Sequence, residues 1–306
     1  MKHIYDMVII GGGPAGYSAA LYASRAGLDT LVIEKMSVGG QMALTGEIEN
    51  YPGFNEGVDG FTLGTNMQAG AERFGAKTEY ANVSALKLDI YPKEIVADGK
   101  TYFSKTVVIA TGADPRPLGL DKEKDLIGRG VHYCAHCDGR FYKGKTVAVV
   151  GGGNSALSDA LYLSRLAKKV YLIHRRDTLR ATKIYHEPFM KAENIEFIKN
   201  SIVTDITAPQ RVSAITLQSV TDKTERALDC DGLFISIGRE PSTELVKDIL
   251  PLDENGYIIA DETTRTDIDG VYAVGDVRTK ALRQIVTAVA DGAVAAHYAE
   301  EYLSSI

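Results

Sequence analysis

Two cysteines are separated by only two residues in the segment Cys134–Gly139, which reads Cys-Ala-His-Cys-Asp-Gly. This spacing allows a small disulfide ring, and thiol–disulfide exchange needs one accessible thiolate with a resolving thiol beside it. Asp138 directly follows the second cysteine and is a candidate proton donor or acceptor, because reducing a disulfide to two thiols consumes protons. The segment therefore predicts a redox-active pair, Cys134 and Cys137, with Asp138 as its acid–base group.

Other interpretations of these residues remain open. A C-x-x-C pair can be half of a zinc site, and His132, His136 and Cys230 are the further candidate ligands. The pair can also be buried and inert, and Asp138 can belong to a plain turn. With three cysteines in all, the chain has no disulfide framework, and a close pair favours a redox role over a structural one. We expect no metal site and interpret Cys230 as structural.

The elements that must position this pair contain a glycine-rich pattern twice. The first copy has a strand-like apolar run over residues 5–10, the segment Gly11–Gly16, and a helix-like stretch that ends near Gly27. A second apolar strand, residues 30–33, then ends in Glu34. A G-x-G-x-x-G motif between strand and helix, with an acid roughly 20 residues further on, is the fingerprint of a dinucleotide site.

Each of these residue types has a chemical reason. Gly11 permits a tight turn, Gly13 lets the backbone approach a pyrophosphate, and Gly16 lets the helix pack closely on the strand. The helix N-terminus offers free N–H groups and a partial positive charge to the phosphates. Glu34 can accept hydrogen bonds from a ribose diol. The alternative is a glycine-rich turn that binds nothing.

The second copy starts with the strand-like run 146–150 and continues through Gly151–Ala156, which reads Gly-Gly-Gly-Asn-Ser-Ala. The strand that follows, residues 169–173, ends in basic residues instead of an acid: His174, Arg175 and Arg176, with Arg180 just beyond. Guanidinium groups bind phosphate through paired, charge-assisted hydrogen bonds, whereas a carboxylate would repel it. The first site therefore suits FAD or NAD and the second suits NADP; the alternative for the arginines is a solvated basic face.

Three more segments complete the organisation. An apolar strand over 271–274 leads into Gly275 and Asp276, and a helix is predicted from about Leu282 to Leu303. The runs 106–110 and 233–237 each end in a glycine turn followed by proline, and we interpret them as crossings between two domains. The predicted fold class is α/β with two Rossmann-like, three-layer dinucleotide-binding domains. The second, residues 115–243, is inserted into a discontinuous first domain made of residues 1–114 and 244–306.

Composition excludes several classes of function. The chain has 306 residues, 45% of them hydrophobic and 24% charged, as in ordinary globular proteins of about two domains. Its net charge of −6 argues against general binding to nucleic acids or anionic membranes. No apolar run is long enough to span a bilayer, and the residues before the first strand-like run lead us to expect no secretory signal. We expect a cytoplasmic protein without nucleic-acid or membrane partners.

The order and spacing of these blocks resemble the low-molecular-weight, bacterial-type thioredoxin reductases over essentially the whole chain. The matching blocks are Gly11–Gly16, Gly39–Gln41, Glu49–Gly53, Ala110–Ala113, Cys134–Gly139, Gly151–Ala156, His174–Ala181, Gly275–Asp276 and Arg283–Ile285. The resemblance implies a homodimer that passes electrons from NADPH through FAD to the Cys134–Cys137 disulfide and then to oxidised thioredoxin or a thioredoxin-like protein. It also implies that Cys137 lies nearer the flavin and that Cys134 attacks thioredoxin.

The motifs and the resemblance together give the expected cofactor contacts. For FAD these are Gly11, Gly13, Pro14, Ala15, Gly16, Glu34, Lys35, Gly40, Gln41, Asn50, Thr111, Gly112, Gly275, Asp276, Arg283, Gln284 and Ile285. For NADPH they are Gly151, Gly153, Asn154, Ser155, Ala156, His174, Arg175, Arg176 and Arg180.

The chain departs from the family pattern at a few positions. His136 stands where threonine is common, and we hypothesise that it stabilises a thiolate and raises the disulfide potential. Ser158 and Asp159 replace a common pair of glutamates, and Ser242 replaces a common asparagine. Some relatives take electrons from ferredoxin and have lost the NADP motifs, but this chain keeps its second glycine motif and its arginines, which favours NADPH.

Rival functions are a peroxiredoxin-reducing subunit, a reductase of ferredoxin or flavodoxin, and a non-catalytic redox sensor that binds NADPH. Peroxiredoxin-linked relatives usually carry an extra N-terminal thioredoxin-like region, for which this sequence has no room. NADP–ferredoxin reductases of this build lack the cysteine pair, and the intact C-x-x-C argues against a sensor.

Overall fold

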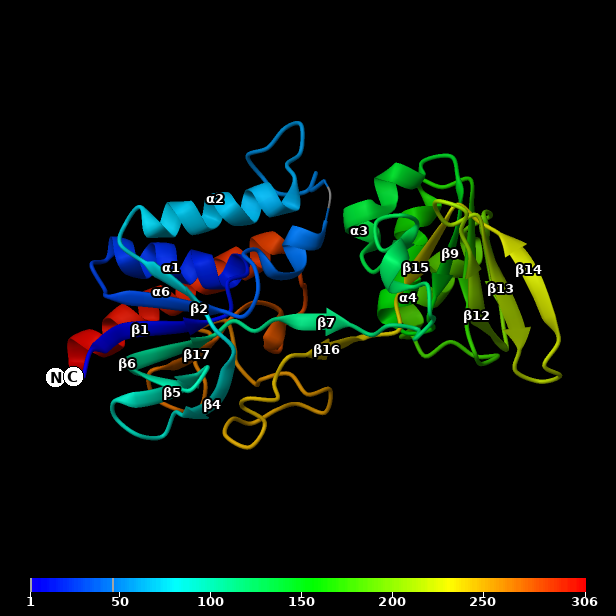
Figure 1. Ribbon diagram of the computed structural model, residues 1–306. Helices are drawn as coiled ribbons and strands as arrows, with labels where there is room; N and C mark the ends of the chain where they lie inside the picture. Colours follow the sequence, from blue (N-terminus) through cyan, green and yellow to red (C-terminus); the bar gives the residue numbers. More distant parts are fainter. Residues whose placement is uncertain (1, 46) are drawn as a thin grey trace. The chain divides into compact units, whose positions relative to one another are not determined.

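A computed structural model describes residues 2–45 and 47–306, which form two compact units (Figure 1). Unit 1 combines the two ends of the chain, up to Asp114 and again from Glu240 onward. Unit 2 is the segment between them, Pro115–Arg239. Each unit has its own sheets and its own hydrophobic clusters.

The sheet of unit 1 has seven strands, of which five are parallel. The parallel part runs in the order β3 (Lys77–Tyr80), β2 (Thr30–Glu34), β1 (Ile4–Ile10), β6 (Lys100–Ile109) and β17 (Val271–Ala273). An antiparallel extension adds β5 (Lys93–Ala97) and β4 (Val83–Lys87).

Strand β6 supports both parts of this sheet. Its first half pairs antiparallel with β5, with Ser104 opposite Lys93, and its last residues pair parallel with β17, with Val107 opposite Val271. The sequence pattern predicted only the run 106–110 as strand, because that half alone is continuously apolar. From Tyr102 to Lys105 the strand alternates between buried and partly buried residues, as expected for an antiparallel strand with one face partly solvated.

The alternation of side chains along β1 divides the core of unit 1 in two. Met7 and Ile9 pack with the helices, whereas Val8 and Ile10 point to the opposite face, toward β4, β5 and the segment that includes Val246. All four β1 side chains are fully or almost fully buried, as expected for a central parallel strand that is covered on both faces.

Three helices cover one face of this sheet: α1 (Pro14–Arg25), α2 (Gly60–Glu72) and α6 (Ile285–Ser305), all visible in Figure 1. Helices α1 and α6 pack very closely, since a Cβ added at Gly292 would lie 2.2 Å from the carbonyl oxygen of Ala15. Alanines fill the rest of this contact, among them Ala19 and Ala295. The predicted start of α6 near Leu282 was three residues early (285 − 282), because Gln284 caps the helix.

The parallel sheet of unit 2 resembles that of unit 1 in its first four strands, but its fifth strand, β8 (Val131–His132), comes first in the unit, whereas β17 comes last. The sheet consists of β11 (Ile195–Ile198), β10 (Lys169–Ile173), β9 (Thr146–Val150), β15 (Gly232–Ile235) and β8. A separate antiparallel sheet contains β12 (Ser201–Thr207), β13 (Ala214–Ser219) and β14 (Glu225–Asp229). Strand β15 ends at Ile235, before the predicted end at Ile237.

Unit 2 consists of three layers: helices, the parallel sheet and the antiparallel sheet. The helices α3 (Ala135–Asp138), α4 (Asn154–Ser164) and α5 (His186–Lys191) lie on one face of the parallel sheet. The antiparallel sheet covers the other face through residues such as Ile206 and Ile215. Val147 and Val149 of β9 face the helices, and Ala148 and Val150 face the antiparallel sheet.

The two crossing segments between the units pair with each other as a small sheet of β7 (Ala113–Pro115) and β16 (Arg239–Pro241). Sequence analysis placed the second boundary after Thr243, which is a few residues too late. Ser242 donates its backbone N–H to Gly112, 3.0 Å away, and the Thr243 hydroxyl donates to Gly256 at 3.0 Å, so both residues belong to unit 1.

Among the residues that the structure describes, no helix combines the length and the apolar composition needed to cross a membrane.

Candidate active site

The glycine loop of unit 1 lies where β1 ends and α1 begins. Gly11 has φ +109°, and a Cβ there would lie 2.4 Å from the Ala110 oxygen. Gly16 is equally confined, since its Cβ would lie 2.0 Å from the Gly11 oxygen. Among the described residues, by contrast, nothing lies within 4 Å of a Cβ added at Gly13, and no side chain caps the N-terminus of α1. The loop is thus closed on its protein side and open where a pyrophosphate would approach.

Glu34 lies next to this loop, at the end of β2. Its Oε2 accepts a hydrogen bond from the backbone N–H of Gly12 at 2.6 Å, and its Oε1 accepts from Met36 at 3.0 Å. The carboxylate is therefore fixed beside the opening, at the position where a ribose would lie in a dinucleotide complex. Lys35, the next residue, is exposed.

Further predicted FAD contacts gather at the same edge, where the parallel strands of unit 1 have their carboxyl ends. The amide Nδ2 of Asn50 donates to Gln284 at 3.0 Å, and Gln41 donates to Asp114 at 2.6 Å. The Thr111 hydroxyl donates to the carbonyl of Ser242 at 2.7 Å. Gly40 opens a short 3₁₀ helix, and Gly112 has φ +75°.

The turn after β17 brings the C-terminal segment to this edge. Gly275 has φ +74°, and its Cβ would lie 3.0 Å from that of Ala15 in α1. Arg283 donates to the carbonyls of Asp276 at 3.4 Å and Arg278 at 3.1 Å. Ile285 begins α6 and packs against Met42 and its neighbours.

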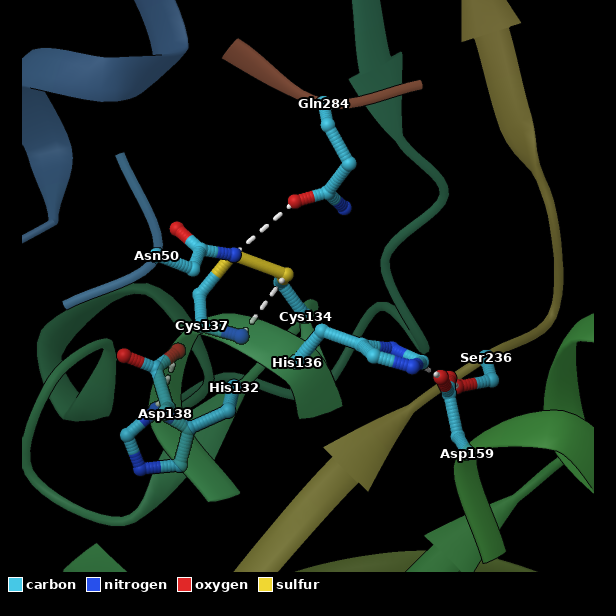
Figure 2. Close-up of a disulfide and its surroundings, with 9 residues drawn as sticks. All are labelled: Asn50, His132, Cys134, His136, Cys137, Asp138, Asp159, Ser236 and Gln284. Carbon is cyan, nitrogen blue, oxygen red and sulfur yellow. Dashed lines mark hydrogen bonds and ion pairs between the residues drawn. A yellow bond between two sulfur atoms is a disulfide. The ribbon is translucent and has the colours of Figure 1, made fainter. Parts of the chain in front are cut away.

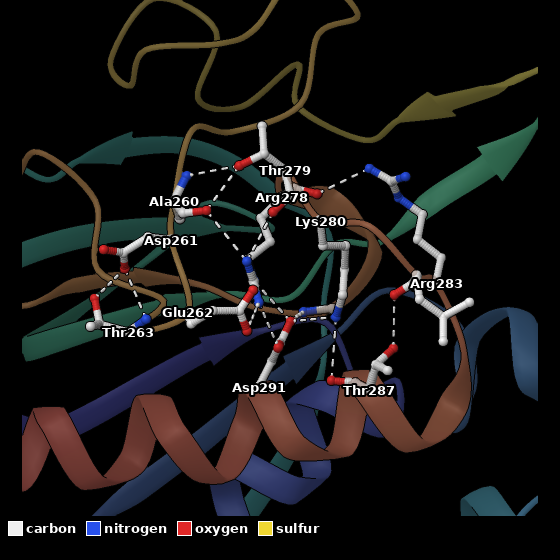
Figure 3. A network of polar contacts seen from close by, with 12 residues as sticks. Ala260, Asp261, Glu262, Thr263, Arg278, Thr279, Lys280, Arg283, Thr287 and Asp291 are labelled. Carbon is white, nitrogen blue, oxygen red and sulfur yellow. Dashed lines mark hydrogen bonds and ion pairs between the residues drawn. The ribbon is translucent and has the colours of Figure 1, made fainter. Parts of the chain in front are cut away.

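A buried network that the sequence analysis did not identify holds this turn (Figure 3). Asp291, on α6, accepts hydrogen bonds from the Gly275 backbone at 2.8 Å, from Arg278 at 2.8 and 2.9 Å, and from Lys280 at 2.8 Å. All three side chains are under 10% exposed. Burial opposes ionisation of Asp291, but the bonds from Arg278 and Lys280 outweigh it and lower its pKa.

The glycine loop of unit 2 has the same geometry. Gly151 has φ +149°, with the Ser236 oxygen 2.3 Å from an added Cβ. A Cβ added at Gly153, like one at Gly13, has nothing within 4 Å in the part of the chain that the structure describes, and α4 begins beyond it with no side-chain cap from that part. Asn154 accepts a hydrogen bond from the Thr182 backbone at 2.8 Å. Ser155 is exposed, whereas Ala156 is fully buried against the sheet.

His174 occupies in unit 2 the place that Glu34 occupies in unit 1. Its ring lies against Gly152, where an added Cβ would be 2.4 Å from Cε1. The ring is buried, its Nε2 has no partner in the described part of the chain, and burial together with Arg175, Arg176 and Arg180 lowers its pKa. The three arginines are exposed. This is a cationic edge with a buried, unsatisfied ring nitrogen, which fits a phosphate.

The cysteine pair forms a disulfide, with the two Cα atoms 5.3 Å apart (Figure 2). Cys134 caps the short helix α3, and its sulfur accepts the backbone N–H of Cys137 at 3.2 Å. In this oxidised state the two sulfur atoms are bonded to each other, so neither cysteine is a free thiol. No cluster of three or more His, Cys, Asp or Glu side chains in residues 2–45 and 47–306 has a metal-binding arrangement.

Asp138 is connected to two residues to which the sequence analysis gave no such role. Its Oδ2 lies 3.0 Å from Nδ1 of His132, and Nε2 of His132 lies 2.7 Å from the Tyr142 hydroxyl. His132 is 6% exposed. A histidine within the otherwise apolar strand β8 was the signal in the sequence, but only the structure shows its partners.

His136 points to α4. Its ring stacks on Tyr162 with centroids 4.3 Å apart. Its Nδ1 lies 3.8 Å from Asp159, as Figure 2 shows. Asp159 also accepts a hydrogen bond from the Ser236 hydroxyl, and its pKa is raised by burial. The effect of His136 on the disulfide potential stays a hypothesis.

Cys230 is a buried free thiol, and burial together with the nearby Asp231 raises its pKa to about 12. It lies in the core of unit 2 beside β14 and β15. Its surroundings therefore favour the inert thiol rather than a thiolate.

Comparisons with known proteins agree with this arrangement. The model of the pyridine nucleotide-disulphide oxidoreductase family matches residues 5–292. A thioredoxin reductase of Listeria innocua is 46% identical over 100% of this chain and 96% of its own length. A bifunctional thioredoxin reductase/thioredoxin of Mycobacterium leprae is 42% identical over 98% of this chain and 66% of its own length. The crystal structure of a thioredoxin reductase from Streptococcus pyogenes has a TM-score of 0.93 at 42% identity, with 100% of both chains covered.

Proposed function

The chain belongs to the pyridine nucleotide-disulphide oxidoreductase family and acts as a thioredoxin reductase, and we propose that it does so with FAD in unit 1 and NADPH in unit 2. The observation that carries the proposal is the Cys134–Cys137 disulfide with an acid beside it, in a chain that has two open dinucleotide loops. The family relationship makes the chain a flavin- and nicotinamide-dependent oxidoreductase.

FAD is assigned to unit 1. The opening at Gly13 and the uncapped N-terminus of α1 suit its pyrophosphate, and the fixed carboxylate of Glu34 suits a ribose diol. Gln41, Asn50 and Gln284 present amide groups at the same edge, and Asp276 follows Gly275 there. When bound, FAD supplies the means to accept a hydride and to pass on two electrons.

NADPH is assigned to unit 2 because the chain has cations where unit 1 has Glu34. The 2′-phosphate distinguishes NADPH from NADH, and Arg175, Arg176 and Arg180 supply the guanidinium groups that bind it. The buried Nε2 of His174 lacks a partner in the described residues and is a further donor or acceptor for the nucleotide.

The cysteine pair accepts the electrons. Reduction breaks the S–S bond, and two electrons with one proton leave one thiol and one thiolate. We assign the proton to Asp138, which lies in the same turn as Cys137 and whose carboxyl group is fixed by His132. Cys134 then attacks the disulfide of thioredoxin, and Cys137 resolves the mixed disulfide, so the Cys134–Cys137 bond forms again. Thioredoxin leaves with one thiol and one thiolate, and a proton from solvent completes the second thiol.

Thioredoxin is the substrate implied by the relatives, one of which is named as a reductase and a thioredoxin in a single chain. We further propose a homodimer, as the family resemblance implies. Sedimentation velocity of the FAD-loaded protein tests this, and a monomeric species would contradict it.

The test of the function is anaerobic bleaching of the bound flavin by NADPH, and separately by NADH, followed by oxidised thioredoxin. We expect rapid bleaching by NADPH, little by NADH, and recovery of the flavin colour with thioredoxin. Cys134→Ser and Cys137→Ser should bleach but fail to reduce thioredoxin. If neither nucleotide bleaches the flavin, the assignment of NADPH is wrong and reduced ferredoxin is the donor to test.

A further inference from the structure

A buried chain of polar side chains runs from the redox turn into the core of unit 2. It consists of Asp138 at the end of α3, His132 in β8, and Tyr142 in the next turn, with contacts of 3.0 Å and 2.7 Å (Figure 2 shows the first of these). His132 and Tyr142 are 6% and 2% exposed. Burying a polar group costs free energy unless the group is hydrogen-bonded, and each of these buried groups has a partner.

The packing holds the imidazole ring in one orientation. The ring stacks on Phe234 of β15 with centroids 5.1 Å apart, and Tyr142 meets both rings edge-on. Gly232 leaves the space for Tyr142, since an added Cβ would lie 2.4 Å from the Tyr142 ring. The two ring nitrogens of His132 therefore each face a fixed partner.

The direction of the hydrogen bonds follows from the chemistry of the end groups. Burial raises the pKa of Tyr142 to about 12, so its hydroxyl keeps its proton and can donate it to Nε2 of His132. An imidazole that accepts at Nε2 carries its proton on Nδ1. That Nδ1–H then donates to Oδ2 of Asp138.

We propose that His132 is a positioning residue for the reduction of the disulfide. By donating to Oδ2, it confines the proton that Asp138 exchanges with the cysteine pair to the other carboxyl oxygen, Oδ1. Tyr142 keeps the imidazole in the tautomer that this requires. The inference rests on the proposed function, because it assumes that the Cys134–Cys137 bond is the one reduced.

The step balances without a further reactant. The S–S bond breaks as it takes up two electrons, which bound FAD would supply, and the proton on Oδ1 moves to one sulfur. This leaves a thiol, a thiolate and a carboxylate at Asp138. The Nδ1–H of His132 donates to that carboxylate throughout, so the imidazole itself gives up no proton. A proton from solvent then restores the acid for the next cycle.

Other charged groups near the chain bear on its pH dependence. Arg211, Asp231 and Cys230 act electrostatically on Tyr142, and the Lys145 ammonium lies 5.3 Å from its ring. These groups are unchanged in the variants below, so differences between variants report on the His132 bonds.

The test compares three variants of the FAD-loaded enzyme. His132→Leu removes both hydrogen bonds. His132→Asn keeps an N–H donor where Nδ1 stood but cannot reach Tyr142. Tyr142→Phe keeps the ring packing and removes only the hydroxyl that fixes the tautomer. Each enzyme is reduced anaerobically with NADPH, and the appearance of thiols is followed by rapid quenching with a thiol reagent between about pH 6 and 9. The melting temperature of each variant and the bleaching of its flavin by NADPH are measured in parallel as controls.

We expect His132→Leu to slow thiol formation about tenfold, a fraction of what a general acid contributes. A general acid must be protonated to act, so the alkaline limb of the pH profile, where the rate falls, should move to higher pH when the carboxylate loses a donor. His132→Asn should recover most of the rate and the pH profile, and Tyr142→Phe should lose about threefold. Flavin bleaching by NADPH should be the same in all of them.

The proposal is overturned if His132→Leu and His132→Asn lose the same rate, or if the pH profile is the same in all variants. If His132→Leu does not fold, the test rests on His132→Asn and Tyr142→Phe. Wild-type rates and pH profiles in both of these variants would contradict the proposal. Thiol formation needs no thioredoxin, so another dithiol partner leaves the result intact. Wild-type enzyme that bleaches without forming thiols contradicts the proposed function instead.

Discussion

The two glycine loops differ mainly in the side chains at the end of the strand that follows the helix of each loop, β2 in unit 1 and β10 in unit 2. In unit 1 the Glu34 carboxylate is fixed by the Gly12 backbone, and in unit 2 His174 lies against Gly152 with three arginines around it. A negative group favours hydroxyls, and a positive cluster favours a phosphate. We therefore assign the difference in nucleotide preference between the two loops to Glu34 in unit 1 and to His174 and the three arginines in unit 2.

Removing the arginines should weaken the preference for NADPH. For Arg175→Ala combined with Arg176→Ala, we expect the KM for NADPH to rise tenfold or more, since a hydrogen bond to a charged group contributes about 1.5–3 kcal/mol. The KM for NADH should not change. Steady-state kinetics with both nucleotides measure this. Lys223→Asn removes a positive charge from the β13–β14 turn and should change neither constant.

Cys230 should take no part in the reaction. Because burial keeps its thiol protonated, with a pKa of about 12, Cys230→Ala should retain wild-type turnover. Titration of the native NADPH-reduced enzyme should find two rapidly reacting thiols per chain in both proteins, from Cys134 and Cys137. A third fast thiol in the wild type, absent from the variant, would contradict this.

Single residues could be predicted from the sequence when their partners are close in the chain or are set by a motif. Gly11, Glu34 and the cysteine pair belong to this group, since strand–turn–helix geometry determines their surroundings. His132 and Asp291 do not, because their roles depend on side chains that only the packing brings to them, such as Tyr142 and Arg278.

At the scale of elements, α6 does more than cover the sheet. Its residue Asp291 holds the turn after β17 through the Gly275 backbone, Arg278 and Lys280 (Figure 3). One buried carboxylate thus faces two cations, and removing it would take the buried counter-charge from both. Arg278 would keep its ion pair with Glu262 at 3.6 Å, but the Glu262 side chain is exposed. The position of Gly275 and Asp276 therefore depends on a residue well inside the last helix.

This network should make stability depend on acid. The pKa of Asp291 is lowered in the folded protein, so its contribution is present above the unfolded value near 3.8 and is lost as the pH falls through the lower, folded value. We expect Asp291→Asn to reduce the free energy of unfolding at pH 7 by about 3 kcal/mol. Its stability should fall less steeply than that of the wild type below about pH 4.

Chemical denaturation of both proteins between about pH 3 and 7 measures this. Glu301→Gln, on the exposed side of the same helix, is the matched control and should cost less than about 1 kcal/mol. Parallel pH curves for the wild type and Asp291→Asn would show that the carboxylate does not contribute in this way. FAD affinity, measured by fluorescence on reconstitution, should fall in Asp291→Asn alone.

The elements themselves were predicted best where apolar runs are continuous. β9 and β10 have the expected bounds, Thr146–Val150 and Lys169–Ile173, because both faces of these strands are buried. The first half of β6 was missed because its pairing with β5 leaves alternate side chains only partly buried. The start of α6 depends on the Gln284–Thr287 cap, which a helical pattern alone does not contain.

At the scale of the whole molecule, the chain forms two units with separate cores, and each has one dinucleotide loop. In scanning calorimetry we expect a component that NADP⁺ shifts upward while leaving the FAD-dependent component in place. Saturation at about 100 times the Kd should stabilise unit 2 by roughly 2.7 kcal/mol. A single transition that moves as a whole with NADP⁺ would show that the units unfold together.

The small β7–β16 sheet brings the two ends of unit 2 together. The N–H of Arg116 donates to Gly238 at 3.0 Å on one side of this sheet, and that of Ser242 donates to Gly112 at 3.0 Å on the other. An insertion whose first and last residues are neighbours can be exchanged without stretching the host chain. Residues 115–239 can thus be replaced as one segment. A chimaera that carries the equivalent segment of a relative would have that relative's nucleotide preference, while its flavin-binding unit would be unchanged.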